Sequence, residues 1–149
     1  MKATYTNIKY VEWLSAEIMH KNSIEWLSDL EFMKDEQLFF DDLIKSYTLQ
    51  LIDSKHFKES KRIIDTLSKL QTKTDLLIES VKTHKNDLKI MVDGIDQPKE
   101  EEGYKNEHRG LIVEINNFIK DYRILKTELF SLIKNIKKAE KQKRLIDKT

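Results

Sequence analysis

Apolar residues recur at alternating four- and three-residue steps over three long stretches of the chain, and this spacing predicts three amphipathic helices. The first, about 22–53, carries a stripe of Trp26, Leu30, Met33, Gln37, Phe40, Ile44, Tyr47 and Leu51. The second, about 58–93, carries Ile63, Leu67, Leu70, Thr74, Leu77, Val81, His84, Leu88 and Met91. The third, about 98–146, carries Tyr104, His108, Leu111, Ile115, Phe118, Tyr122, Leu125, Leu129, Leu132, Ile136 and Ala139. Stripes of this period are typical of helices packed side by side in a bundle.

The connections between these stretches are short. Residues 53–58 interrupt the periodicity without glycine or proline, and Gly94 is expected to end the second helix. Pro98 suits the first turn of the third helix, where its missing N–H has no acceptor, and the glutamates at 100–102 stabilise the positive end of the helix dipole. The pattern therefore predicts an all-α, elongated up-down-up three-helix bundle with coiled-coil-like packing.

Composition agrees with an elongated helical protein. The 149 residues include only three glycines and one proline, too few for the many turns of a β-rich fold, and 36% of the residues are charged. The absence of cysteine excludes disulfides, thiolate metal sites and a cysteine nucleophile. No run approaches the roughly 20 apolar residues of a membrane span and residues 1–10 lack a signal-peptide core, so we expect a soluble cytoplasmic protein.

Residues 1–21 form an N-terminal extension to a bundle over 22–149. We expect a short helix that is capped by Asn7 and has one apolar face, formed by Ile8, Val11, Leu14 and Ile18. The pentapeptide at 11–15 nearly repeats at 24–28, and this 13-residue offset turns the second copy by about 220° on one helix. We therefore expect a break near His20 to Asn22, with Asn22 as N-cap. The alternatives are an unbroken helix with a stutter, a flexible extension, or a chain that starts at Met19.

The lengths of the connections predict which residues face each other. Antiparallel pairing about loops near residues 56 and 96 places Gln37, Thr74 and Phe118 in one layer, where amide and hydroxyl satisfy each other. The same register places His84 opposite His108. The favoured interpretation is a pair of histidines with ordinary hydrogen-bond partners near the end of the bundle. The alternative is a divalent metal site near Glu25 and Glu107, with His84 and His108 as the candidate ligands.

Charge is strongly polarised although the net charge is only +1. Residues 22–53 hold eight acids and two lysines, whereas residues 134–149 hold seven basic residues and two acids. The end of the third helix is expected to extend past the bundle and to carry Lys137, Lys138, Lys141, Lys143 and Arg144. Such a basic helix end is expected to contact nucleic acid, an anionic surface or the acidic first helix of another copy, unless it is simply solvated.

Phe32, Phe39 and Leu43 lie beside the stripe of the first helix and widen it. They either enlarge the core face or are covered by the extension or by a second protein chain. Glu17-x-x-His20 and Asp53-x-x-His56 have di-iron spacing but fall in predicted connections, and no phosphate-binding loop or nucleophile elbow occurs. No catalytic residue and no cofactor is predicted. We expect a non-enzymatic interaction or scaffold protein that contacts a protein partner or another copy of itself.

A resemblance supports the same fold. The residues that carry it are Trp26, Leu27, Leu30, Phe32, Glu36, Phe39, Phe40 and Leu43. This run, followed by two more long helices, resembles small bacterial helical-bundle proteins that have no assigned activity. The resemblance covers residues 22 to about 140. It implies an all-α bundle and carries over no functional residue.

Overall fold

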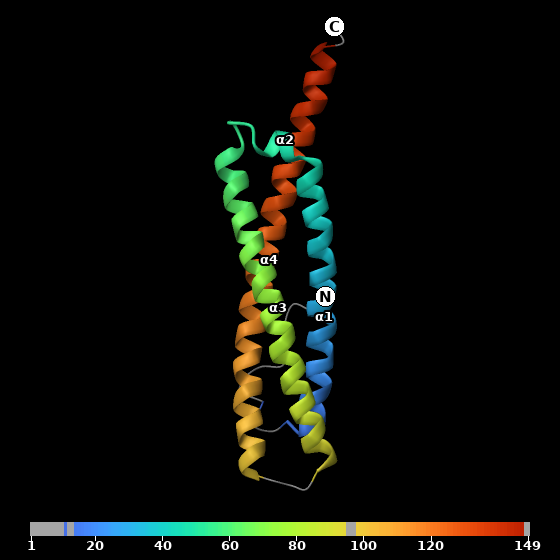
Figure 1. Ribbon diagram of the computed structural model, residues 1–149, viewed down its shortest axis with the longest axis vertical. Helices are drawn as coiled ribbons and strands as arrows, with labels where there is room; N and C mark the ends of the chain where they lie inside the picture. The colour runs from blue at the N-terminus through green and yellow to red at the C-terminus, as the bar shows by residue number, and fades with distance from the viewer. Residues whose placement is uncertain (1–10, 12–13, 95–97, 148–149) are drawn as a thin grey trace.

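The computed structural model describes residue 11 and residues 14–94 and 98–147, which form a long, narrow helical bundle (Figure 1). Its helices are α1 (Ala16–Ser46), the single turn α2 (Thr48–Leu51), α3 (Phe57–Asp93) and α4 (Pro98–Asp147). No β-strand occurs among the described residues. Side-chain contacts join Asn22 to His108 and Phe40 to Phe130, so α1 and α4 run in the same direction and α3 runs opposite to both. The predicted all-α, up-down-up bundle is confirmed.

The core forms where the three predicted stripes pack against one another. Every stripe position from Trp26 to Phe40, from Ile63 to Leu88 and from His108 to Ile136 is buried. Fully burying one large apolar side chain stabilises the fold by about 1.5–3 kcal/mol, so these stripes supply most of the driving force for folding. α3 packs closely against both α1 and α4, whereas α1 and α4 approach each other mainly through large side chains.

The predicted break at His20 to Asn22 is wrong, because α1 continues without interruption from Ala16. Its N-cap is Ser15, whose side-chain oxygen accepts a hydrogen bond from the Ile18 N–H at 3.2 Å. Met19 and Ser23 are fully buried and extend the four-three alternation back from Trp26. The Ser23 hydroxyl donates to the Met19 carbonyl at 2.9 Å, which satisfies a polar group inside the core. Asn22 therefore lies within the helix and does not cap it.

The N-terminal extension is described only in part, and the predicted cap Asn7 and the apolar Ile8 lie outside the described residues. Val11 is fully buried and Leu14 packs against the core. Leu14 precedes the first turn of α1, and Ile18 on that turn is 47% exposed. These residues therefore do not form the single helical face that the sequence predicted.

The first predicted helix is interrupted at Tyr47, which separates α1 from α2. The Ser46 hydroxyl donates to the Asp42 carbonyl at 3.0 Å, and the Thr48 hydroxyl lies 3.1 Å from the Ile44 carbonyl oxygen. Hydroxyls that bond to carbonyls of the preceding turn compete with main-chain N–H groups and bend helices. Leu51 still reaches the core and is 2% exposed, so the predicted stripe survives the interruption.

Gly94 ends α3 as predicted, but in an extended conformation instead of the left-handed one common at helix ends. A Cβ atom at this position would lie 3.0 Å from the Ile90 carbonyl oxygen. Glycine is therefore suited to this end because the chain leaves the helix close to its own backbone.

The predicted hydrogen bond between Gln37 and Thr74 is present. The Gln37 amide donates to the Thr74 hydroxyl at 2.8 Å, and that hydroxyl donates to the Leu70 carbonyl at 2.7 Å. Gln37 and Thr74 are both buried, as is Phe118 on α4. The hydrogen bond joins α1 to α3 at one height and confirms the register that the first connection predicted.

Replacing Thr74 with Val should reduce the free energy of unfolding by about 1–3 kcal/mol, because the buried Gln37 amide loses its acceptor. Adding Gln37→Leu should recover part of that loss, since no unpaired polar group then remains. Urea unfolding followed by circular dichroism measures both. Thr72→Val is the matched control, because the exposed Thr72 hydroxyl bonds only within α3, to Ser68. Additive losses in the double variant would contradict the proposed pairing.

Candidate functional site

A partly buried polar contact holds α1 against α4 near the middle of the bundle. The Tyr122 hydroxyl donates to the Glu36 carboxylate at 2.6 Å, and the Lys126 ammonium donates to the other carboxylate oxygen at 2.7 Å. Burial and, secondarily, the Glu36 hydrogen bond raise the pKa of Tyr122. The phenol therefore stays protonated and remains a donor.

One turn further along, a cluster of aromatic rings spans the same two helices. The ring of Phe40 lies 6.2 Å from Phe39, 6.2 Å from Tyr122 and 5.6 Å edge-on from Phe130, measured between centroids. Phe40 is fully buried, whereas Phe39 is 56% and Phe130 is 40% exposed. Phe32, seven residues before Phe39 on the same face of α1, is 60% exposed. We call Phe32, Phe39, Phe40 and Phe130 the aromatic seam.

Two of the three apolar residues predicted as an interaction surface thus lie at the surface. Leu43 is only partly exposed and packs against the core, which agrees with the alternative that it widens the core face. Phe130 was missed by sequence reasoning. Phe130 is the residue after Leu129, which belongs to the stripe of α4. Its contact with Phe40 depends on the parallel register of α1 and α4, which the pattern of α4 alone does not reveal.

The predicted pair of histidines is also present, at the end of the bundle near the start of α1. Nε2 of His84 and Nδ1 of His108 are 2.9 Å apart, and both side chains are fully buried. The indole of Trp26 stacks on the His108 ring at 4.5 Å. The Glu107 carboxylate lies 3.2 Å from Nδ1 of His84, although off the line of a good hydrogen bond.

One assignment of ring protons is compatible with the contact between the two rings and with the contact to Asn22. With its proton on Nδ1, facing Glu107, His84 accepts at Nε2 from the Nδ1–H of His108. Nε2 of His108 is then an acceptor, 3.5 Å from the amide nitrogen of Asn22 on α1. Each imidazole is neutral in this arrangement. The chain of contacts joins α1, α4 and α3.

Burial keeps both rings neutral. It lowers the pKa of His84 to about 4 and that of His108 to about 3, with the neighbouring His84 contributing to the second shift. Glu107 and His84 are therefore not an ion pair near neutral pH. Burial, followed by the charge of Asp87, raises the pKa of Glu107.

The direct hydrogen bond bears on the candidate metal site at His84 and His108. A zinc ion holds imidazole nitrogens at about 2.0–2.1 Å with both lone pairs directed at the metal, whereas here one of the two facing nitrogens is a donor. Among the described residues, no three or more histidine, aspartate or glutamate side chains gather in an arrangement that would hold a metal ion. The geometry is that of a hydrogen-bonded core pair.

The basic end of α4 extends past α2 and the start of α3 (Figure 1). Ile136 is the last buried stripe residue, Ala139 is exposed, and all residues from 141 to 147 are exposed. Lys137 lies over the ring of Tyr47 at 6.0 Å. The other predicted contact residues are exposed as well. They are Lys138, Lys141, Lys143 and Arg144.

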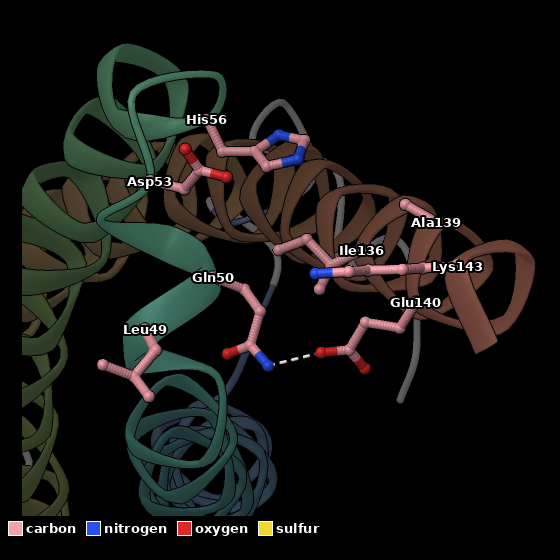
Figure 2. Close-up of a pocket in the computed structure, with 8 residues that line it drawn as sticks. All are labelled: Leu49, Gln50, Asp53, His56, Ile136, Ala139, Glu140 and Lys143. Atoms are coloured by element: carbon pink, nitrogen blue, oxygen red, sulfur yellow. Dashed lines mark hydrogen bonds between the residues drawn. The ribbon is translucent and has the colours of Figure 1, made fainter. Parts of the chain in front are cut away.

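An open pocket of about 570 Å³ lies where this overhang leaves the bundle (Figure 2). Asp53 and His56 from the connection face Glu140 and Lys143 of α4 across it, and the Gln50 amide donates to Glu140. The Asp53-x-x-His56 spacing thus falls on an exposed connection, as the sequence predicted. The pocket mixes acidic and basic groups and shows no assembled catalytic or metal-binding set.

Comparison of the chain with protein-family models, with curated proteins and with solved structures found no match. The resemblance to small bacterial helical bundles therefore gains no support from these comparisons. None of the helices in the described part of the chain contains a segment long and apolar enough to traverse a bilayer.

The histidine pair should make stability depend on pH. Both imidazoles have a lowered pKa in the folded state, so below about pH 6.5 the unfolded chain binds protons that the folded chain does not. The free energy of unfolding should fall by up to about 2 kcal/mol per histidine between pH 7 and pH 5, measured by urea unfolding.

His84→Gln should remove about half of this pH dependence, whereas His56→Gln, on the exposed connection, should leave it unchanged. An equal stability at pH 5 and pH 7 would contradict the buried neutral pair. If zinc raised the unfolding midpoint of the parent and not of His84→Gln, the pair would instead be metal ligands.

Proposed function

We propose that this protein is a non-enzymatic interaction module that binds the apolar surface of another protein chain through the aromatic seam. The observation that supports this most strongly is the split exposure of one ring cluster. Phe40 is fully buried, yet Phe39 and Phe130, which pack against it, keep about half of their surface in water. Scattered exposed apolar residues are normal, but a contiguous group of rings on two helices is typical of a binding surface.

The seam is also well suited to bind at a low entropic cost. Its centre is anchored on the buried ring of Phe40, and the Glu36, Tyr122 and Lys126 contact holds α1 and α4 together one turn away. Aromatic side chains have few rotatable bonds, and rings held in place lose little further freedom when a partner covers them. Aromatic anchors of this kind dominate the energetics of many interfaces.

The basic overhang supports a competing role in contacting nucleic acid or an anionic surface. Its lysines and Arg144 would attract phosphates. Between Lys134 and Thr149 the sequence has no aromatic residue, so single-stranded bases have no platform on which to stack. The seam therefore has the stronger support, and the overhang is better regarded as an additional charged element.

A photoreactive phenylalanine analogue placed at position 39 should form a discrete covalent adduct with a partner chain when the cells that produce the protein are irradiated. The matched control places the same analogue at Leu76, which is 60% exposed on α3, compared with 56% for Phe39. Adding Phe130→Ala to the position-39 variant should reduce the adduct several-fold, because the partner loses the exposed ring that α4 contributes to the seam.

The size of the adduct on a denaturing gel identifies the kind of partner, since the chain itself has a mass of 17.8 kDa. Adducts of equal yield from positions 39 and 76, or an adduct unaffected by Phe130→Ala, would contradict the proposed function.

A further inference from the structure

We infer that a second copy of this chain occupies the aromatic seam, related to the first by a two-fold axis parallel to the helices. This inference rests on the proposed function and names the partner. The distribution of charge on either side of the seam and the common direction of α1 and α4 support it.

The two helices that flank the seam carry opposite charge. Residues 25–46 of α1 contain seven acids and two lysines, and residues 115–138 of α4 contain six basic residues and two acids. One minority charge on each helix, Lys34 on α1 and Glu128 on α4, faces α3. Lys34 pairs with Asp75 at 3.1 Å, and Glu128 pairs with Arg62 at 2.9 Å. The outward surface of α1 is consequently acidic and that of α4 is basic.

Several of these outward charges are not used within the chain. Asp35 and Asp42 on α1 are exposed, as are Arg123 and Lys134 on α4. Among the residues that the structure describes, none of these four side chains forms an ion pair. They leave an acidic row and a basic row facing solvent on the two sides of the same apolar surface.

The register places these rows at matching heights. Contacting residues of α1 and α4 differ in number by 86 to 90, as shown by Glu36 with Tyr122 and by Phe40 with Phe130. Asp35 is therefore level with Arg123, and Asp42 lies about one turn from the level of Lys134. Since α1 and α4 run in the same direction, this matching is preserved when a copy is rotated about an axis parallel to them.

Such a rotation places α1 of each copy against α4 of the other. The acidic row of one then faces the basic row of its partner twice, and the phenylalanines meet at the same height in the middle. A two-fold axis perpendicular to the helices would instead place α1 against α1 and α4 against α4, where like charges repel. An isologous interface requires a surface complementary to itself, and the parallel arrangement meets this condition.

Charge reversal with cross-rescue tests the inference. The first variant, Asp35→Lys with Asp42→Lys, makes both rows basic, and the second, Arg123→Glu with Lys134→Glu, makes both rows acidic. At about 100 μM the parent should have twice the 17.8 kDa monomer mass by sedimentation equilibrium. Each variant alone should dimerise at least about tenfold more weakly, because like charges then face each other.

An equimolar mixture of the two variants should recover the parental dimer, since both contacts between α1 and α4 again join opposite charges. Raising the salt concentration to about 0.5 M should weaken both the repulsion and the rescue. Circular dichroism verifies that each variant is folded, which is expected because all four positions are exposed. Failure of the mixture to dimerise more strongly than either variant would overturn the inference.

A separate measurement tests whether the two copies are parallel or antiparallel. The chain has no cysteine, and a side chain at the exposed Gly103 on α4 would meet nothing within 4 Å, so Gly103→Cys offers a single site for a spin label. A parallel dimer places the two labels at one end, within about 30 Å, whereas an antiparallel dimer separates them by about 70 Å. The longer distance would overturn the parallel arrangement.

These results separate the inference from the proposed function. A parent chain that is monomeric at about 100 μM overturns self-association. If position 39 still forms its adduct with a chain of another mass, the seam binds a different protein and the proposed function stands. If position 39 forms no specific adduct, both fail.

Discussion

The alignment of the three long helices depends on polar side-chain contacts that are buried or partly buried and that occur between each pair of helices. Gln37 bonds to Thr74 between α1 and α3, and His84 bonds to His108 between α3 and α4. Between α1 and α4, the Glu36 carboxylate accepts from the Tyr122 phenol. An apolar stripe that repeats every seven residues tolerates a slip of one repeat, about 10.5 Å, with similar apolar burial. Each polar contact loses its partner in such a slip, at a cost of about 1–3 kcal/mol, so the three together specify one alignment.

Much of this architecture follows from the sequence because the determining contacts are between helices joined by short connections. Antiparallel pairing of the helices about the two short connections was sufficient to predict that Gln37 lies beside Thr74 and His84 beside His108. The start of α1 was missed for a specific reason. Ser23 occupies a core position, and a polar residue there interrupts the apolar pattern. Its burial is explained only by the hydrogen bond from its hydroxyl to the Met19 carbonyl. The helix α1 ends before Tyr47, where the hydroxyls of Ser46 and Thr48 bond to carbonyls of the preceding turn, and apolar periodicity does not reveal such bonds.

The seam was harder to predict since it lies between α1 and α4, which are separated in the sequence by the whole of α3. Their register is parallel and is set by packing through the core, so no single connection determines it. Phe39 was identified from one helix alone, whereas Phe130 becomes significant only when its ring is found on Phe40. The histidines illustrate the opposite case. Their proximity was predictable, but the direct bond between the rings, and with it their neutral character, required the side-chain geometry.

The overhang of α4 shows how the bundle controls a segment that it does not cover. An isolated helix of two turns is unstable in water, because forming the first turn fixes several residues for a single hydrogen bond. In α4 that nucleation occurs within the bundle, and the exposed residues 141–147 need only propagate an existing helix. The lysines and Arg144 on this segment are therefore arrayed along the direction of the bundle axis instead of on a random coil. The core thus fixes the orientation of a positive charge located some 10 Å beyond its last buried side chain.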